Sequence, residues 1–401
     1  MTNYHTLTQA EAVAYAQGIE EIFPDGAQLK LRDIGDGNLN NVFHIWDQAS
    51  GRSLILKQAL PYFKMVGESV PLTLDRVRIE YEALRINGEI CPDQTPKVYT
   101  YDSDLALIAM EDLSDHTVMR RGLMEKVRAP LFAEHVGSFL AQTMFFTSDL
   151  AMDQQEKKLR VKSFINPELC NITEDLILYA PFTKSRLNSV EPHIRDSVVR
   201  IWEDKELHLE VTLLREIFLT KAEALLHGDL HTDNIFIKSD STKVIDREFA
   251  FYGPIGFDIG TLIGNVLLNY SGQEGWSTDA RERTNYRRYL LDTVNDLWTQ
   301  FESQFRDLWN GYAADRLVNT PGYQDFYVTK LLQDTIGFAG VLMLCRVYGY
   351  IHVADIDDIK DAAARERAQR TALEIGVALI KRNRSAHSIK EVLDIALKVV
   401  K

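Results

Sequence analysis

Up to about residue 112, the chain alternates short runs of β-branched and aromatic residues with polar turns. The runs "NVFHIW", "SLILKQAL" and "LALIAM" are typical of strands. Between the last two runs, Leu74, Val77, Tyr81 and Leu84 recur every three or four residues, which predicts an amphipathic helix. This part is therefore predicted to fold as a small antiparallel sheet with one helix packed on it.

The rest of the chain has mostly helical periodicity, as in "HVGSFLAQTMFF" and "HLEVTLLREIFLTKAEALL", interrupted by two strand-like runs, "NIFIK" and "KVID". An apolar stripe over 291–308 predicts core packing, with a partner interface as the alternative. The pattern predicts an α+β fold with two lobes. The β-rich lobe spans 1–112, the mostly α-helical lobe spans 113–401, and a hinge lies near 110–113.

Composition narrows the class of protein. The net charge of −13 over 401 residues argues against nucleic-acid binding. Three widely spaced cysteines predict neither disulfides nor a zinc site. The first residues lack the layout of a signal peptide. The apolar run "IGFAGVLMLC" is shorter than the roughly 20 residues of a membrane span. We expect a cytoplasmic protein that binds no membrane.

The run "GDGNLN" is the first candidate for ligand binding. It supplies Gly35, Gly37, Asn38 and Asn40 between two strand-like segments, as glycine-rich phosphate loops do. Asn40 stands where such loops usually have a third glycine, and asparagine tolerates positive φ better than most residues. A plain hairpin turn is the alternative interpretation.

A lysine and a glutamate fit the same nucleotide site. Lys57 lies in the next strand-like run, and Glu80 borders the apolar face of the predicted helix. In kinases such a lysine neutralises the α- and β-phosphates of ATP, and such a glutamate positions the lysine. The hinge residues Met110, Glu111 and Leu113 complete the predicted nucleotide site. Lys57 and Glu80 could instead be surface residues.

The second lobe carries the predicted chemistry. In "HGDLHTDN", Asp229 and Asn234 have the spacing of a kinase catalytic loop, where the aspartate accepts the proton of the attacking hydroxyl. Asp246 and Glu248 follow two strand-like runs later and, with Asn234, predict a magnesium site of hard oxygen ligands. Asp258 precedes a helical run, so we expect an N-cap that also bonds the backbone of the catalytic loop.

These motifs resemble the aminoglycoside phosphotransferase and choline kinase group of small-molecule kinases. Within that group, "GDGNLN", "KQALPY", "MEDLSDH", "EFAFYGPIGFDIG" and "HVADID" resemble the S-methyl-5-thioribose kinase family. The resemblance implies a two-lobed, protein-kinase-like homodimer of methionine salvage, which uses ATP and Mg²⁺ to phosphorylate the 1-hydroxyl of methylthioribose. It also implies Asp229 as base, Asp246 and Glu248 as metal ligands, and Lys57 as the nucleotide lysine.

The chain departs from the family pattern at three places, which involve four residues. Val70 replaces a usual Trp, 233–234 read Asp–Asn in place of Gly–Ser, and Cys345 precedes Arg346 where two arginines are usual. Arg346 is predicted to bind the sugar; a salt bridge to an acid such as Asp334 is the alternative. Two other functions stay open: a kinase of a related 5-modified or 5-deoxy pentose, and a catalytically silent binding protein with a kinase fold.

Overall fold

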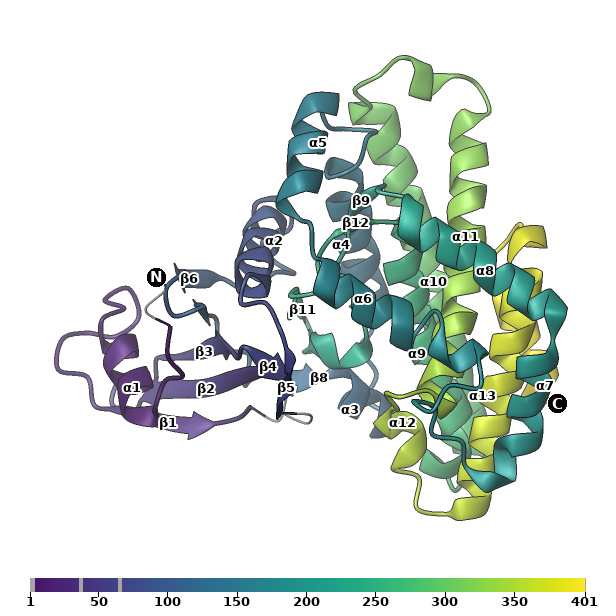
Figure 1. Ribbon diagram of the computed structural model, residues 1–401, viewed down its shortest axis with the longest axis horizontal. Coiled ribbons are helices and arrows are strands. Elements are labelled where there is room, and N and C mark those ends of the chain that lie inside the picture. The colour runs from purple at the N-terminus through teal and green to yellow at the C-terminus, as the bar shows by residue number, and fades with distance from the viewer. Residues whose placement is uncertain (1–3, 36–38, 64–66, 401) are drawn as a thin grey trace. The chain divides into compact units, whose positions relative to one another are not determined.

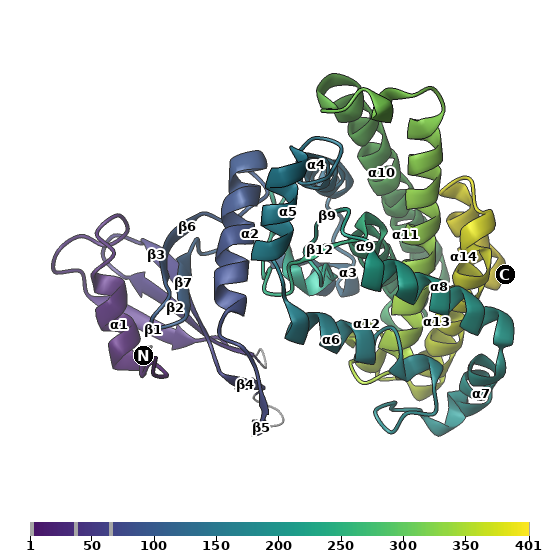
Figure 2. The ribbon, with the colours of Figure 1, turned by 45° about the horizontal axis from the view of Figure 1, so that its top comes forward.

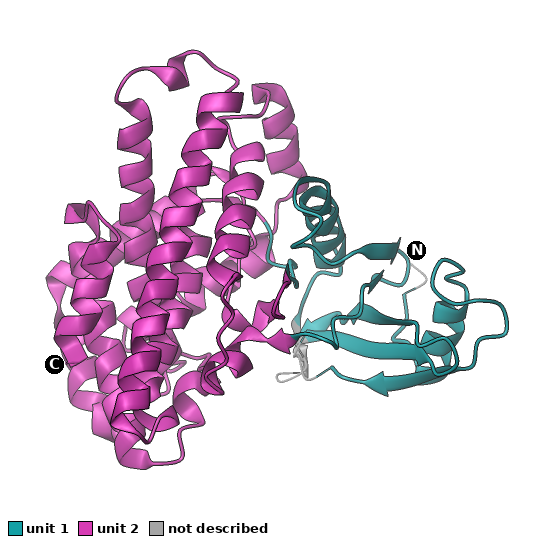
Figure 3. Cartoon of the chain, turned by 180° about the vertical axis from the view of Figure 1, so that it is seen from behind, with its two compact units in different colours: residues 1–116, 243–250 teal, residues 117–242, 251–401 magenta. Residues whose placement is uncertain are grey.

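The computed structural model describes residues 4–35, 39–63 and 67–400. These residues form two compact units (Figure 3). Unit 1 contains residues 1–116 and 243–250, and unit 2 contains 117–242 and 251–401. The lobe boundary predicted at residue 112 would place 243–250 in the helical lobe. The structure instead groups this segment with unit 1.

Unit 1 is built on a five-stranded antiparallel sheet with the strand order β1-β2-β3-β7-β6 (Figure 1). The predicted helix is α2, and the structure adds α1 and a two-stranded hairpin, β4–β5. The bounds are α1 (Gln9–Gln17), β1 (Leu29–Asp33), β2 (Asn40–Asp47), β3 (Ser53–Ala59), β4 (Tyr62–Phe63), β5 (Gly67–Pro71), α2 (Arg76–Ile90), β6 (Val98–Asp102) and β7 (Leu107–Met110).

The sheet of unit 1 has apolar residues on both faces. Leu107 and Ala109 of β7 belong to the core cluster that includes α1, whereas Ile108 and Met110 belong to the cluster that includes Val77 of α2. Alternation along a strand explains this division, because successive side chains point to opposite faces. The continuous apolar run "LIAM" is therefore a strand covered on both sides.

Unit 2 is mostly helical, as predicted, and confirms the larger helical lobe of the α+β fold (Figures 1 and 2). Its helices are α3 (Met119–Met124), α4 (Phe132–Phe146), α5 (Gln154–Ser163), α6 (Pro167–Leu176), α7 (Arg195–Glu203), α8 (Lys205–Thr220), α9 (Ile255–Trp276), α10 (Ala280–Tyr312), α11 (Tyr323–Tyr348), α12 (Ala354–Asp357), α13 (Ala362–Arg382) and α14 (Lys390–Val400). Its short strands are β8 (Thr117–Val118), β9 (Ala224–Leu225), β10 (Ile235–Ile237) and β12 (Tyr252–Gly253), and the unit boundary falls inside β11 (Thr242–Val244).

Helices α9 and α11 form the centre of unit 2 and carry several of the predicted site residues. A Cβ on Gly260 would lie 2.6 Å from the carbonyl oxygen of Thr335, and one on Gly264 would lie 2.9 Å from that of Ala339. Only glycine allows the two backbones to approach so closely. This contact fixes the placement of α9 relative to α11.

Two apolar features of unit 2 are part of its core. On α10, Leu291, Val294 and Trp298 are buried, and α10 packs on α4, so the stripe is core packing. Helix α11 is long and apolar enough to span a membrane by length and composition, with a mean hydropathy of 1.3 over its most apolar window. However, 83% of that window is buried inside the protein, as in the central helix of a globular domain.

Candidate active site

The loop between β9 and β10 contains the predicted catalytic residues and is held by Asp258. The N-cap of α9 is Pro254 and not Asp258 as expected; Asp258 lies buried in the first turn of the helix. Its carboxylate accepts hydrogen bonds from the backbone N–H of His227 at 2.6 Å and of Gly228 at 3.0 Å. Gly228 has φ +83°, a conformation that favours glycine. The backbone before Asp229 is therefore fixed by a buried charge.

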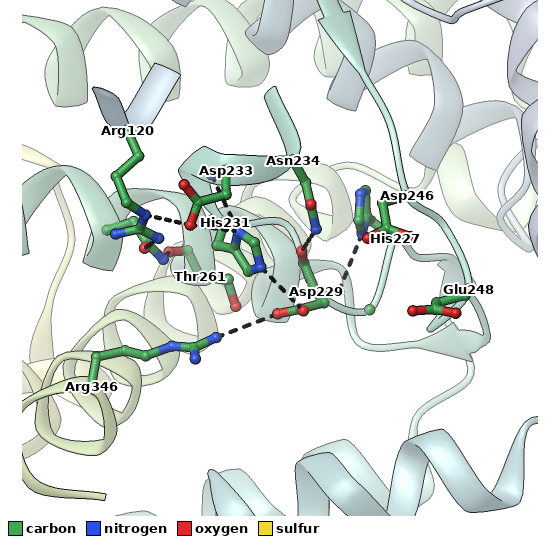
Figure 4. A network of polar contacts seen from close by, with 12 residues as sticks. Arg120, His227, Asp229, His231, Asp233, Asn234, Asp246, Glu248, Thr261 and Arg346 are labelled. Carbon is green, nitrogen blue, oxygen red and sulfur yellow. Dashed lines mark hydrogen bonds and ion pairs between the residues drawn. The ribbon is translucent and has the colours of Figure 1, made fainter. Parts of the chain in front are cut away.

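Asp229 presents a partly exposed carboxylate between two cationic or polar groups (Figure 4). One oxygen lies 3.3 Å from His231 Nε2, and the other accepts a hydrogen bond from Arg346 at 3.5 Å. Burial raises the pKa of Asp229, but His231, Arg346 and His227 together lower it well below its usual range. The carboxylate is therefore ionised at neutral pH and can accept a proton.

His231 is a site residue that the sequence analysis missed. The backbone N–H of Asp233 donates to His231 Nδ1 at 3.2 Å, so this nitrogen carries no proton in the neutral ring. The proton is then on Nε2, which faces Asp229. The available signal was the short spacing from Asp229: the His231 backbone N–H donates to the carbonyl oxygen of Asp229 at 2.9 Å, a tight turn that keeps the two residues adjacent.

Asn234 is placed by a bond to the backbone of the same loop. Its Nδ2 donates to the carbonyl oxygen of Asp229 at 3.0 Å. Because the amide nitrogen is used in this way, the amide oxygen is the atom that could ligate a cation. The neighbouring Asp233, a departure from the family pattern, accepts from the buried Arg120 of α3.

Residues 345 and 346 of α11 have different surroundings. Arg346 is only 5% exposed and meets Asp229, whereas the Cys345 thiol donates to the carbonyl oxygen of Leu176 at 3.3 Å. Successive helical side chains are about 100° apart, which explains the difference. The alternative partner for Arg346, Asp334, instead accepts from Lys221 and Lys330.

In unit 1, the predicted nucleotide lysine is surrounded by acids. Lys57 lies on β3, and its ammonium donates to Glu80 of α2 at 2.9 Å and also contacts Asp246. Burial lowers the pKa of Lys57, but Asp246, Glu80 and Glu248 outweigh it and raise that pKa. The lysine is therefore held as a cation, as phosphate binding requires. Asp246 itself has φ +61°, which aspartate tolerates better than most residues.

Glu248 is engaged by a buried arginine that the sequence analysis did not single out. Arg76 of α2 is fully buried, and its Nε donates to Glu248 at 3.0 Å. Asn40 Nδ2 donates to the same carboxylate at 3.2 Å. The other nitrogens of Arg76 donate to the carbonyl oxygens of Thr73 at 2.7 Å and of Leu60 at 2.9 Å. Glu248 thus joins β2 to the start of α2.

The remaining predicted nucleotide residues lie around the same sheet. At Gly35, a Cβ would approach the backbone nitrogen of Val42 to 3.1 Å, so the turn is tight. Gly37 and Asn38 lie outside the described residues, as does the side chain of Val70. At the end of β7, Met110 and Leu113 are buried. The Glu111 backbone N–H donates to the carbonyl oxygen of Lys97, and the Glu111 carboxylate accepts from the backbone N–H of Lys97.

The residues predicted to bind magnesium supply suitable atoms. Carboxylate and amide oxygens are the ligands that magnesium prefers, and Asp246 and Asn234 each present one. Glu248 supplies a carboxylate that is shared with Arg76 and Asn40. Within the described part of the chain, no group of three or more His, Cys, Asp or Glu is arranged to hold a metal ion. Asp246 in unit 1 and Asn234 in unit 2 therefore each supply an oxygen of the kind that magnesium takes as a ligand.

Comparison with known proteins agrees with this chemistry. The chain belongs to the phosphotransferase enzyme family, whose model matches residues 30–309. It is 47% identical over 378 residues to a methylthioribose kinase of Geobacillus kaustophilus (strain HTA426), covering 94% of this chain and 93% of that one. It is 44% identical over 380 residues to a methylthioribose kinase of Yersinia pseudotuberculosis serotype O:3 (strain YPIII), covering 95% and 93%. The predicted family resemblance is confirmed.

Among solved structures, the chain is similar to choline kinase from Cryptosporidium parvum Iowa II. The TM-score is 0.48 and the identity is 10%, with 97% of this chain and 99% of that chain covered.

Proposed function

We propose that the protein is an ATP-dependent kinase that phosphorylates the 1-hydroxyl of S-methyl-5-thioribose, a reaction of methionine salvage. The observation that carries this proposal is the 44–47% identity to methylthioribose kinases over nearly the whole chain. The chain departs from the family pattern at Val70, Asp233, Asn234 and Cys345. It keeps the predicted base Asp229, the nucleotide lysine Lys57 and the metal ligand Asp246. A cytoplasmic homodimer is part of the same proposal, by analogy with the family.

In this proposal, Asp229 orients the sugar hydroxyl and accepts its proton. Its lowered pKa keeps the carboxylate ionised, and His231 Nε2 and Arg346 orient its two oxygens for the hydroxyl. Lys57, held as a cation by Glu80, binds the α- and β-phosphates of ATP. Asp246, Glu248 and Asn234 would hold magnesium, which would neutralise charge on the phosphates.

The surroundings of Arg346 favour the binding of a polar substrate next to Asp229. The guanidinium is buried, and its Nε has no hydrogen-bond partner among the described residues. The buried hydroxyl of Thr261 on α9 likewise lacks a partner there. Leaving buried polar atoms unpaired costs about 1–3 kcal/mol each, and a sugar hydroxyl can satisfy them. These atoms favour a sugar as the acceptor.

The experiment is a substrate panel. The protein is incubated with ATP, Mg²⁺ and each of methylthioribose, 5-deoxyribose, ribose and other 5-modified riboses, and the 1-phosphate is identified by ³¹P NMR. We expect methylthioribose to have the highest kcat/KM. A higher value for another 5-modified pentose would reassign the substrate. No phosphoryl transfer to any sugar, with intact ATP binding, would indicate a silent binding protein instead.

A further inference from the structure

Arg120 of α3 is a buried cation close to the catalytic loop. It is only 4% exposed, and each of its three guanidinium nitrogens has a partner. Nε donates to Asp233 of the loop (Figure 4). Nη1 donates to Asp355 of α12, and Nη2 donates to the Asn265 side chain of α9 at 2.9 Å. A buried guanidinium needs such partners to offset its desolvation.

The two acids that contact Arg120 differ in their surroundings. Asp355 is fully buried, and its carboxylate also accepts from Asn269 at 2.7 Å. Its backbone carbonyl accepts from Trp276 Nε1 at 2.8 Å. Asp233, in contrast, has a side chain that is 48% exposed. Asp355 alone can therefore balance the charge of Arg120, so that the bond to Asp233 constrains the loop rather than the core.

A continuous series of contacts leads from Asp233 to the predicted base. The Asp233 backbone N–H donates to His231 Nδ1 at 3.2 Å, and His231 Nε2 lies 3.3 Å from the Asp229 carboxylate. The first of these bonds selects the Nε2–H tautomer, which can donate to Asp229. Any movement of the turn at 232–234 would change the orientation of the imidazole.

We propose that Arg120 is a positioning residue of the catalytic loop: anchored on Asp355, it holds Asp233 and thereby keeps the His231 imidazole directed at Asp229. This inference rests on the proposed function of Asp229 as the base. It also gives a role to the aspartate at 233, where the family usually has glycine. Arg120 and Asp233 contact neither sugar nor nucleotide in this proposal and act only through His231.

The test removes the negative charge at the exposed end of the series and leaves the buried end intact. In Asp233→Asn, Arg120 keeps Asp355, so the fold should be preserved. The matched control is Asp196→Asn, which removes a carboxylate that is 54% exposed and is paired with Arg370 in the same unit. Both variants are compared with wild type in kcat, in the KM for sugar and for ATP, and in Tm. A second readout is the imidazole ¹⁵N shifts of His231, assigned by comparison with His231→Gln.

We expect Asp233→Asn to lower kcat by about 10- to 100-fold, as the loss of an orienting contact does elsewhere, with Tm and the KM for ATP as in the control. The His231 shifts should move from those of the Nε2–H tautomer toward an average of both tautomers. Asp233→Glu, which retains the carboxylate, should recover part of the kcat. Unchanged kcat and unchanged His231 shifts in Asp233→Asn would overturn the proposal.

The NMR readout separates this inference from the proposed substrate. If the wild type phosphorylates no sugar but the His231 shifts respond to Asp233→Asn alone, the proposed function fails and the contact series stands. If methylthioribose is phosphorylated at the same rate by wild type and Asp233→Asn, the positioning role fails and the proposed function stands. Arg120→Lys gives an independent check, because lysine keeps the charge but cannot bond Asp233, Asp355 and Asn265 together.

Discussion

Replacing Arg346 with alanine tests the substrate side of the proposed site. In the structure, its guanidinium makes a single hydrogen bond at the outer limit of length, 3.5 Å to Asp229, and its Nε has no partner among the described residues. Removing this guanidinium therefore costs the substrate-free protein little hydrogen-bond energy. A bound sugar, in contrast, would lose at least one charged hydrogen bond.

The expected effect follows from the energy of such a bond. A hydrogen bond to a charged group contributes about 1.5–3 kcal/mol, which corresponds to a roughly 10- to 150-fold higher KM for the sugar in Arg346→Ala. The KM for ATP should remain within about twofold of wild type, because Arg346 lies in unit 2 and the nucleotide lysine, Lys57, lies in unit 1. The assay is ADP release with one substrate varied and the other saturating.

The control is Arg287→Ala, since Arg287 is similarly buried in unit 2. Its guanidinium donates to the carbonyl oxygen of Tyr270 at 3.0 Å and contacts Glu274, so that it holds α9 to α10. This variant should lower Tm and leave both KM values unchanged. If Arg346→Ala instead lowers Tm and raises both KM values together, Arg346 is structural. A sugar KM within twofold of wild type would refute the assignment as well.

Further predictions concern three acids, Asp229, Asp246 and Glu248. Asp229→Asn should keep its Tm but lower kcat, by roughly 10²–10⁴-fold for the loss of a general base. Burial raises the pKa of Asp229, but the opposite effect of His231 and Arg346 is larger, so the net pKa is lowered. The base therefore stays ionised as the pH falls from 8 to 5. The rate attributable to it should fall only below the usual aspartate range, which a kcat/KM–pH profile would show. Asp246→Ala should abolish turnover at all Mg²⁺ concentrations, and restored activity at high Mg²⁺ would contradict this. Glu248→Ala should lower stability by about 3–5 kcal/mol, because it leaves the buried Arg76 without the carboxylate that balances its charge. The same variant should raise the Mg²⁺ requirement. Urea unfolding and Mg²⁺ titration measure the two effects separately.

The fold could be predicted from the sequence wherever one element has one clear period. The strands β2, β3 and β7 and the helix α2 follow directly from apolar spacing. Helix α1 was missed, although Thr8 and Glu11 form a capping box at its start. The grouping of 243–250 with unit 1 has no local signal, since it depends on contacts such as Val244 N–H to the carbonyl of Gln94.

The site could be predicted only where a motif fixes the residue type and its spacing. Lys57 meets Glu80, and Asp258 bonds the loop backbone, as their positions led us to expect; their roles in the reaction remain predictions. Arg76 and Arg120 were missed because a buried arginine looks like a surface arginine until its partners are known. Their acidic partners are distant in sequence, so neither the composition nor the hydrophobic periodicity of the chain predicts these ion pairs.

Cys345 stands where the family pattern has an arginine, and its surroundings in the structure lead to a last prediction. Restoring the family arginine with Cys345→Arg would place a second cation beside Arg346, in a position where the thiol is 1% exposed and donates to Leu176. Burial already raises the pKa of this thiol to about 11, so the position disfavours charge. The nearby acid, Asp229, is engaged by His231 and Arg346.

We therefore expect Cys345→Arg to lower stability by about 1–3 kcal/mol through overpacking, without increasing kcat/KM for methylthioribose. Cys345→Ser, which preserves the donor, should resemble wild type in both assays. A gain in kcat/KM with unchanged Tm would show that the pocket has room for the second arginine and that this chain has lost a useful sugar contact.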